Sequence, residues 1–354
     1  MPFMPHHAPL RRLPPFLLAA AALASGAPAL AASEDGCPVH EGQPPSVAVR
    51  IDNDLLGGQD EGYTNGIVFT FASPNVTDYT DDPCLPSAAR FVNHAFTWMQ
   101  PHHAEQRNMT FSFAQAIFTP TDATRSDLIT DDRPYAALLV GTFGYHGRKG
   151  NRLDSRLIRL GWVGPSARGQ EVQEAVHKIT GSSDFEGWNN QLHDEPVFQL
   201  QREWTQRWDG PTPDMDAMVH WGGSLGTITT NLVTGVQWRY GRGLPDDFGS
   251  LPLWAAGDNT APRRPSSSVG RSWSGHVFVG ADVRWVLHSL VLDGNTFRNS
   301  HSVERRDIVG ELSYGFQVRY DDWKFALTRY HRSLEFDGQR RRPVFGSFTI
   351  AHEF

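Results

Sequence analysis

Between Asp307 and Tyr320, an apolar set and a partly charged set of side chains alternate along the sequence. The even positions of this segment are apolar, aromatic or glycine, whereas its odd positions include Glu311, Gln317 and Arg319. Because successive side chains of a β-strand point to opposite faces, this segment forms a strand with one apolar and one charged face. Such a strand fits between lipid and a polar interior, which predicts the wall of a transmembrane β-barrel. The alternative is a large soluble β-sandwich, which would bury the apolar face in a core.

The same two-residue period occurs elsewhere in the chain. From Val277 to Leu287 the apolar residues alternate with residues such as Asp282 and Arg284, and residues 344–354 repeat the pattern and end on the aromatic Phe354, as outer-membrane barrels tend to do. Further matches lie at residues 46–52, 65–72, 107–114, 135–145, 154–163, 196–208, 216–226, 231–241 and 323–332. We therefore predict an all-β fold, a transmembrane antiparallel barrel of about twelve strands with both termini on the periplasmic side.

The first 31 residues have the layout of a cleaved secretory signal. Arg11 and Arg12 precede an apolar stretch, and small residues follow at Ala29-Leu30-Ala31. We expect a signal peptide at residues 1–31 and one barrel domain at 32–354. Beyond the signal there is no run of eighteen apolar residues, which excludes a membrane-spanning helix. Barrel strands have low average hydropathy, and the mean hydropathy of −0.42 fits that class.

The net charge bears on which partners the protein can bind, and the cysteine content bears on whether a disulfide can form. The formal net charge is −7 and no long basic run occurs, so a nucleic-acid partner has no electrostatic basis. The only two cysteines, Cys37 and Cys84, could pair as a disulfide in an oxidising compartment. Their spacing does not decide between a disulfide and two unpaired thiols.

Three connections stand out from the short turns of the pattern. Residues 73–106 and 242–273 both fall on the periplasmic side, so either they form small appended elements or the strand count is off. The third contains a helix at Gly169–Thr180, in which apolar residues recur at helical spacing. Gln173 and His177 stand one turn apart on the polar side of that helix. We place this helix on an extracellular loop and not in the wall.

Oxygen-bearing side chains cluster at the first connection. Asn53 and Asp54 end the first strand, and Tyr63-Thr64-Asn65-Gly66 begins the second. Carboxylate, amide and hydroxyl oxygens are the ligands that a hard cation such as calcium requires. The same residue types are also ordinary turn formers, and the spacing alone favours the turn.

His177 and Arg125 are the other candidates. His177 lies in the last turn of its helix, where the negative end of the helix dipole favours the protonated form and can tune a general base. Arg125, in the connection after the third strand, can contact an anion such as phosphate. A solvated histidine and a solvated loop arginine are the alternatives. By strand parity, however, Asn53, Asp54, Arg125 and His177 all fall on one rim of the barrel, which favours a shared function.

Five segments resemble one family, the outer-membrane lipid A 3′-O-deacylases. They are IDNDLLGGQDEGYTNG (51–66), FAQAIFTP (113–120), DDRPYAALL (131–139), VGPSARGQEVQEAVHKITG (163–181) and GWNNQLHDEP (187–196). They span most of the N-terminal half, whereas the C-terminal half matches only as barrel strands.

The resemblance implies a twelve-stranded barrel with an active site at the outer leaflet, between the wall and an extracellular helix. It implies calcium as cofactor, His177 as the base that activates water, and Asn53 and Asp54 as the essential pair beside the calcium. Thr64 is then the hydroxyl of the Tyr-Thr motif, and Gln173 lines the helix face. No Ser nucleophile is needed, and no Gly-x-Ser-x-Gly motif occurs.

The sequence departs from the family pattern at two places. Arg125 stands where a lysine is expected and could contact substrate, but with a different geometry. Ser183, followed by Asp184, stands where an acidic residue is expected beyond the histidine. Either change could alter the acyl position preferred or weaken the activity.

These observations support three hypotheses about function. The leading hypothesis is a monomeric outer-membrane hydrolase that removes the 3′-linked acyl chain of lipid A, the membrane anchor of lipopolysaccharide, and contacts outer-membrane lipids. A passive barrel, such as a porin or scaffold, is the alternative from another class. Within the enzyme class, the alternative is an outer-membrane phospholipase that acts on a different ester.

Overall fold

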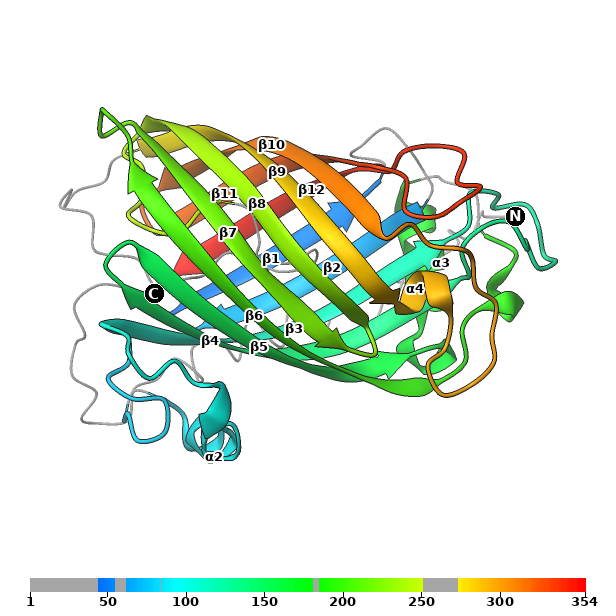
Figure 1. Ribbon diagram of the computed structural model, residues 1–354, viewed down its shortest axis with the longest axis horizontal. Helices are drawn as coiled ribbons and strands as arrows, with labels where there is room; N and C mark the ends of the chain where they lie inside the picture. Colours follow the sequence, from blue (N-terminus) through cyan, green and yellow to red (C-terminus); the bar gives the residue numbers. More distant parts are fainter. Residues whose placement is uncertain (1–43, 55–61, 84, 181–184, 251–272) are drawn as a thin grey trace, which may run out of the picture.

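The computed structural model describes residues 44–54, 62–83, 85–180, 185–250 and 273–354, in which twelve strands form one closed antiparallel barrel (Figure 1). Each strand pairs with its neighbours along the chain, and the last pairs with the first. The strands are β1 (Ser46–Asn53), β2 (Gly62–Ala72), β3 (Gln106–Thr119), β4 (Ala136–Lys149), β5 (Arg152–Val163), β6 (Glu195–Asp209), β7 (Met215–Gly226), β8 (Thr229–Arg242), β9 (Trp273–Ser289), β10 (Ile308–Tyr320), β11 (Trp323–Arg332) and β12 (Val344–Glu353). The predicted twelve-stranded barrel is confirmed.

The predicted alternation of faces is confirmed on the wall. In β10, Ile308, Tyr314 and Phe316 are exposed on the outward face, whereas Glu311 and Ser313 are buried on the inward face. Exposed apolar side chains recur on most of the other strands, as expected for a surface that contacts lipid. Among the described residues, no helix has the length and apolar character to cross a membrane.

Ion pairs between neighbouring strands fill much of the lumen. Arg239 on β8 bonds the buried Asp216 on β7 at 2.6 Å, and Arg332 on β11 bonds Glu311 at 2.6 Å. Buried charges are stable only when they are paired in this way. A cavity of about 260 Å³ remains between them. The charged residues that alternate in the sequence therefore line a packed interior.

Short segments fill both ends of the lumen. At one end, Leu290 of the short helix α4 (Leu290–Asp293) packs against the inward-facing Leu138 and Val140 of β4. At the other end, the segment after β8 enters the barrel, where Asp246 bonds Arg148 at 2.7 Å. Asp247 follows with a 2.6 Å bond to the Arg239 guanidinium. Burial alone would raise the pKa of Asp247, but the charge of Arg239 together with the hydrogen bonds from Arg239 and the Gly249 amide lowers that pKa.

The two ends of the barrel carry different connecting segments. The terminal end, where β1 begins and β12 ends, carries the connection between β2 and β3. This connection contains α2 (Ser87–Ala95) and the 3-10 helix η2 (Thr97–Met99), and it packs on the outside of the wall. The explanation of residues 73–106 as a small appended element is therefore confirmed. The opposite end, which we call the α3 end, carries the predicted helix α3 (Gly169–Thr180).

Several sequence-based expectations fall beyond what the structure describes. The signal peptide at residues 1–31, Cys37, Cys84, Ser183, Asp184 and most of the connection at 242–273 lie outside the described residues. The signal peptide and the disulfide stay predictions.

Candidate functional site

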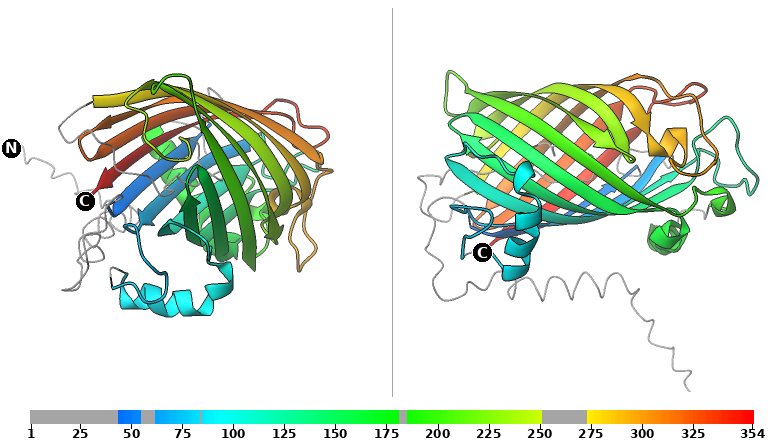
Figure 2. Two further views of the ribbon diagram at one scale, coloured as in Figure 1. Left: turned by 60° about the vertical axis from the view of Figure 1, so that its left-hand side comes forward. Right: turned by 60° about the horizontal axis from the view of Figure 1, so that its bottom comes forward.

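Helix α3 lies against the outside of the barrel wall and not over its mouth (Figure 2). The even residues of β3 and β4, such as Ala116 and Leu138, line the lumen, so their odd residues face outward. Two of these outward residues, Ile117 and Ala137, join a buried cluster with residues from the loops around α3. This outer cluster consists of Ile117, Tyr135, Ala137, Ala167, Phe185 and Trp188.

Two hydrogen bonds fix α3 on the wall and on its own loop. The outward-facing Gln115 of β3 donates its Nε2 to the Ala167 carbonyl at 2.6 Å, just before the helix begins. Trp188, in the 3-10 helix η4 (Trp188–Asn190), donates its Nε1 to Gln173 Oε1 at 2.9 Å. One face of the helix is thereby held at a defined position above β3 and β4.

Gly169 permits the close approach of α3 to the wall. A Cβ atom at this position would lie 2.4 Å from the Ala137 Cβ and 2.7 Å from the Trp188 ring. Neither neighbour is the far end of a flexible side chain, so any larger residue must displace the helix.

Replacement of Gly169 by valine is therefore expected to loosen α3 while leaving the barrel intact. An overpacking cost of about 1–3 kcal/mol opens the helix more often, so trypsin should cleave after the exposed Lys178 about tenfold faster. The matched control is Gly141→Ala, on the outward face of β4, where a Cβ atom meets nothing closer than 3.8 Å. Equal cleavage rates in the two variants would contradict this account of how the helix is held.

His177 and Gln173 are both buried at this interface. His177 is 3% exposed, and its ring lies 5.8 Å from the Phe185 ring. The alternative of a solvated histidine is therefore wrong. Gln173 accepts the Trp188 hydrogen bond through its oxygen, and its amide nitrogen has no hydrogen-bond acceptor among the described residues. A donor is thus available beside His177 on the helix face.

The first connection reaches the same part of the outer wall. Asn53 ends β1 and lies opposite Asn65 of β2, which in turn lies opposite Ile117 of β3, and Ile117 lies opposite Ala137 of β4. These four residues form a continuous row, here called the outer row, across the outward face at the α3 end. Since α3 packs on Ile117 and Ala137, one end of the row carries the helix and the other carries the amides.

Asp54 and Thr64 flank the amide end of the outer row. Asp54 follows Asn53 directly and is 1% exposed. Thr64 lies where the pairing of β2 with β3 shifts register between Tyr63 and Asn65. Such a β-bulge breaks the regular ladder and is frequent next to active sites. Asn53 and Asp54 therefore lie at the α3 end of the barrel, as the rim they share with His177 predicts, and the backbone of Thr64 lies at the same end.

Asn65 is a further candidate, which the sequence analysis named only as part of the segment Tyr63-Thr64-Asn65-Gly66. The outward positions that follow it in β2 are Ile67, Phe69 and Phe71, so an amide interrupts an apolar face. Asn65 is buried. The break in alternation was visible in the sequence and could have identified it.

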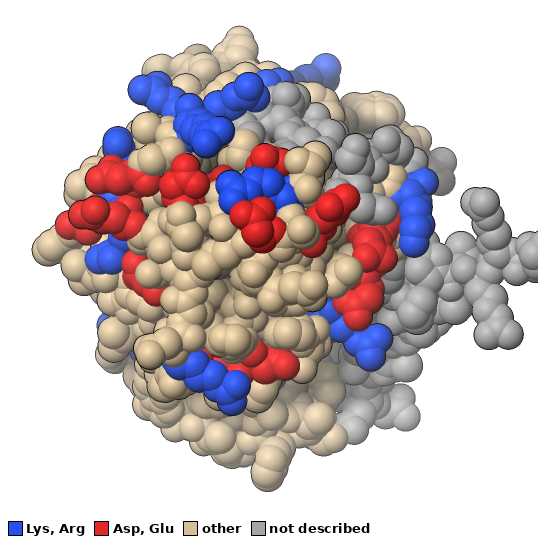
Figure 3. Space-filling model, turned by 90° about the vertical axis from the view of Figure 1, so that its right-hand side faces the viewer, with Lys and Arg blue, Asp and Glu red and all other residues tan. Residues whose placement is uncertain are grey.

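Arg125 belongs to the same end of the barrel but makes a local contact. Its guanidinium pairs with Asp127, two residues along its own loop, and its side chain is 41% exposed. The hydrogen bond with Asp127 raises the pKa of Arg125 and lowers the pKa of Asp127. The structure thus agrees with the alternative of a solvated loop arginine, although the position remains open to an anion from outside. Acidic and basic side chains are mixed over this end (Figure 3).

The donor atoms at Asn53, Asp54 and Asn65 suit a hard cation. Amide and carboxylate oxygens are ligands that calcium accepts, together with backbone carbonyls and water. No group of three or more His, Cys, Asp or Glu side chains placed to hold a metal occurs in the part of the chain that the structure describes. Within the described part of this connection, Asp54 offers a carboxylate and Asn53 offers an amide oxygen for such an ion. Residues 55–61, the rest of this connection, lie outside the described residues.

Comparisons with known proteins identify a matching family and similar solved structures. The family model described as outer membrane protein LpxR matches residues 16–354. Among solved structures, the chain is similar to LpxR from Salmonella typhimurium, with 18% identity and a TM-score of 0.68 over 87% of this chain and 100% of that one. The translocator domain of the autotransporter NalP from Neisseria meningitidis has 11% identity and a TM-score of 0.39, covering 95% and 98%. No curated protein matches the sequence significantly.

Proposed function

The chain belongs to the LpxR family of outer membrane proteins, and from this premise we propose that it hydrolyses the 3′-linked acyl ester of lipid A with the help of calcium. It is a Gram-negative outer-membrane barrel. Since both termini of such barrels lie on the periplasmic side, we infer that the opposite, α3 end faces outward. The lipid A of lipopolysaccharide occupies the leaflet beside that end.

The observation that carries the proposal is the position of His177. It is buried beside Phe185 of the outer cluster, which packs on the outward face of the wall at the end where Asn53 and Asp54 also lie. A substrate that reaches this face comes laterally from the membrane and not through the lumen. An ester whose acyl chains already lie in the membrane is therefore the substrate class that fits best.

The proposed reaction is hydrolysis without a covalent intermediate. His177 accepts a proton from a water molecule as the water oxygen attacks the ester carbonyl carbon. The tetrahedral intermediate then breaks its bond to the sugar oxygen, which takes up the proton from His177, and the free fatty acid leaves. Calcium held by Asn53 and Asp54 would supply positive charge that stabilises the oxyanion.

The other residues position the reactants. Asn53 and Asp54 would hold the calcium, and the free amide nitrogen of Gln173 can donate to the ester carbonyl or the oxyanion. Thr64, at the register shift between Tyr63 and Asn65, would contribute the hydroxyl that the family resemblance implies. Arg125 lies on the neighbouring loop, where release from Asp127 would let it contact a phosphate of the substrate.

The passive-barrel alternative fits the lumen less well. A porin needs a continuous aqueous channel, whereas α4 and the described segment after β8 enter the lumen from its two ends, beside a cavity of about 260 Å³. A phospholipase acting at the same site is distinguished only by its product.

Expression in a host with fully acylated lipid A tests the proposal. Mass spectrometry of the extracted lipid A is expected to show loss of the complete 3′ acyl substituent, with fragmentation placing the loss on the distal sugar. Unchanged lipid A together with newly formed lysophospholipid would overturn the lipid A assignment in favour of the phospholipase.

A further inference from the structure

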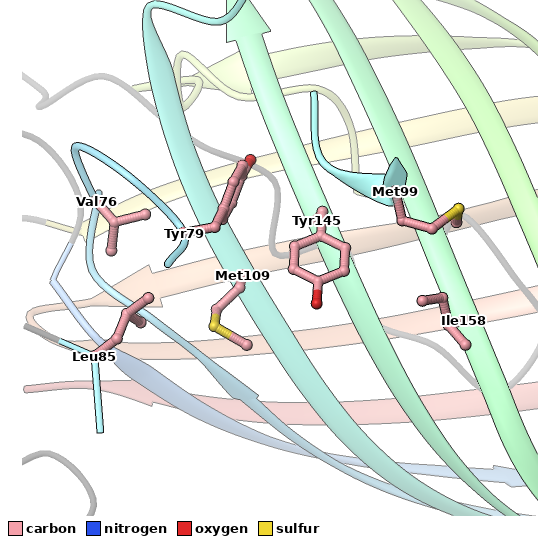
Figure 4. Packing of buried hydrophobic residues seen from close by; sticks show 7 residues of the cluster. All are labelled: Val76, Tyr79, Leu85, Met99, Met109, Tyr145 and Ile158. Carbon is pink, nitrogen blue, oxygen red and sulfur yellow. The ribbon is translucent and has the colours of Figure 1, made fainter. Parts of the chain in front are cut away.

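The segment between β2 and β3 is built onto the outside of the wall at the terminal end. Val76, Tyr79, Leu85 and Met99 pack on Met109, Tyr145 and Ile158, which project outward from β3, β4 and β5 (Figure 4). These wall residues would otherwise face lipid. The segment therefore replaces lipid over this part of the barrel.

Hydrogen bonds hold α2 in a fixed orientation on this surface. Asn93, the buried residue of α2, donates its Nδ2 to the Tyr79 carbonyl at 2.6 Å and accepts from the Tyr145 hydroxyl at 2.9 Å. The Tyr79 hydroxyl in turn donates to the His146 carbonyl at 2.8 Å. Since one face of α2 is bonded to the wall, the opposite face has a defined direction too.

That opposite face is apolar and exposed. Phe91 is 79% exposed, and Ala88 and Ala95 lie on the same side of the helix at three and four residues' distance. Trp98 of η2 continues the surface and is 57% exposed. Large aromatic residues at such exposure indicate a contact that the described part of the chain does not provide.

The apolar face of α2 is continuous with the lipid-facing surface of the barrel. Phe96, between α2 and η2, lies with its ring 6.4 Å from that of Phe143 on β4. Phe143 lies 5.2 Å from Phe111, one of the exposed aromatic residues of the outward face of β3. In Figures 1 and 2, α2 projects sideways from the wall at the end where the C-terminus lies. The segment therefore extends the membrane-contacting surface outward at this level.

We propose that α2 and η2 form an in-plane anchor whose Phe91 and Trp98 insert among the phospholipids of the periplasmic leaflet. Phenylalanine and tryptophan favour the boundary between headgroups and acyl chains, and an amphipathic helix parallel to the membrane buries such residues there. The exposed His94 and Ser87 lie beside the apolar face, where headgroups can hydrogen-bond them. The anchor widens the barrel on one side only and so fixes its rotation and tilt relative to the membrane plane.

Site-specific photocrosslinking tests this anchor independently of any enzymatic activity. The benzophenone amino acid p-benzoylphenylalanine is placed at Phe91 or Trp98, and the full-length protein is reconstituted in vesicles of phosphatidylethanolamine and phosphatidylglycerol. The positive control is Val279, which is exposed on the lipid-facing side of β9. The negative control is Thr212, which is exposed in the turn between β6 and β7 at the same end of the barrel.

The yield of phospholipid adduct decides the outcome. We expect adducts at Phe91 and Trp98 within about twofold of Val279 and at least about fivefold above Thr212, because buried interfacial side chains contact acyl chains continuously. Adduct yields at the level of Thr212 would overturn the proposal. Crosslinks to a second copy of the chain in place of lipid would also overturn it, since they would assign this face to a protein partner. Phe91 is almost fully exposed, so its replacement leaves barrel folding unaffected, which heat-dependent mobility in gels verifies.

Discussion

Replacement of His177 by alanine is expected to lower the rate of lipid A deacylation by a factor of about 10² to 10⁴, the usual contribution of a general base. The side chain is buried beside Phe185 of the outer cluster, and no second histidine is described in that cluster to replace it. The rate is measured by mass spectrometry of lipid A in isolated outer membranes. The barrel itself should remain folded, because no strand of the wall depends on this residue.

The neighbouring Lys178 provides the control for this prediction. It lies on the same helix turn but is exposed, so Lys178→Ala should retain nearly the activity of the unmodified protein. Slow tryptic cleavage after Lys178 in the His177 variant would show that α3 is still held on the wall. Full activity of the His177→Ala protein would contradict the assignment of this residue as the base.

Replacement of Asp54 by asparagine is expected to lower deacylation by about 10²-fold at limiting calcium, the typical loss when one stabilising group for an oxyanion is removed. Asparagine keeps the size of the buried side chain and removes only its charge, so packing at the end of β1 is preserved. Because the other proposed ligands are neutral, the carboxylate contributes most of the attraction for the ion. The measurement is deacylation as a function of calcium concentration, in which higher calcium should partly restore the activity.

A matched change outside the site separates this effect from general loss of charge. Asp122 lies exposed on the connection between β3 and β4 at the same end of the barrel. Asp122→Asn should leave the calcium requirement unchanged. If the Asp54 variant also keeps its calcium requirement, the proposed ligand role of Asp54 is wrong.

The wall of this barrel could be predicted from the sequence because it depends on a local pattern. The period of two between Asp307 and Tyr320 assigns each residue to a face without knowledge of its neighbours, and the structure confirms those faces. The strand order also followed, since consecutive antiparallel strands need no long crossover. The helix at Gly169–Thr180 has the bounds that its apolar periodicity predicts.

The packing of α3 on the wall and the segment that enters the lumen could not be predicted from such a local pattern. The close contact of Gly169 with Ala137 joins residues that are distant in the sequence, and no local pattern reports it. The same holds for the segment after β8, where Asp247 reaches Arg239 inside the barrel. Strand parity could assign His177 to an end of the barrel, but only packing decides that α3 lies on the outside of the wall and that His177 is buried beside Phe185.

The ion pair between Arg125 and Asp127 is a local interaction that the sequence could have indicated. Asp127 lies two residues away on an exposed loop, and the pair needs no tertiary structure to form. Such an exposed ion pair contributes little to stability, so it leaves the guanidinium free to exchange partners. A role in substrate contact therefore depends on competition with Asp127 and stays a proposal.

The central claim is that calcium and His177 act together on lipid A at the outer wall. The most direct measurement compares the lipid A mass spectra of outer membranes incubated with calcium or with a chelator, for the unmodified protein and for His177→Ala. We expect loss of the 3′ acyl group only for the unmodified protein in calcium. Equal acylation in calcium and in chelator, with the protein folded in both, would contradict the account.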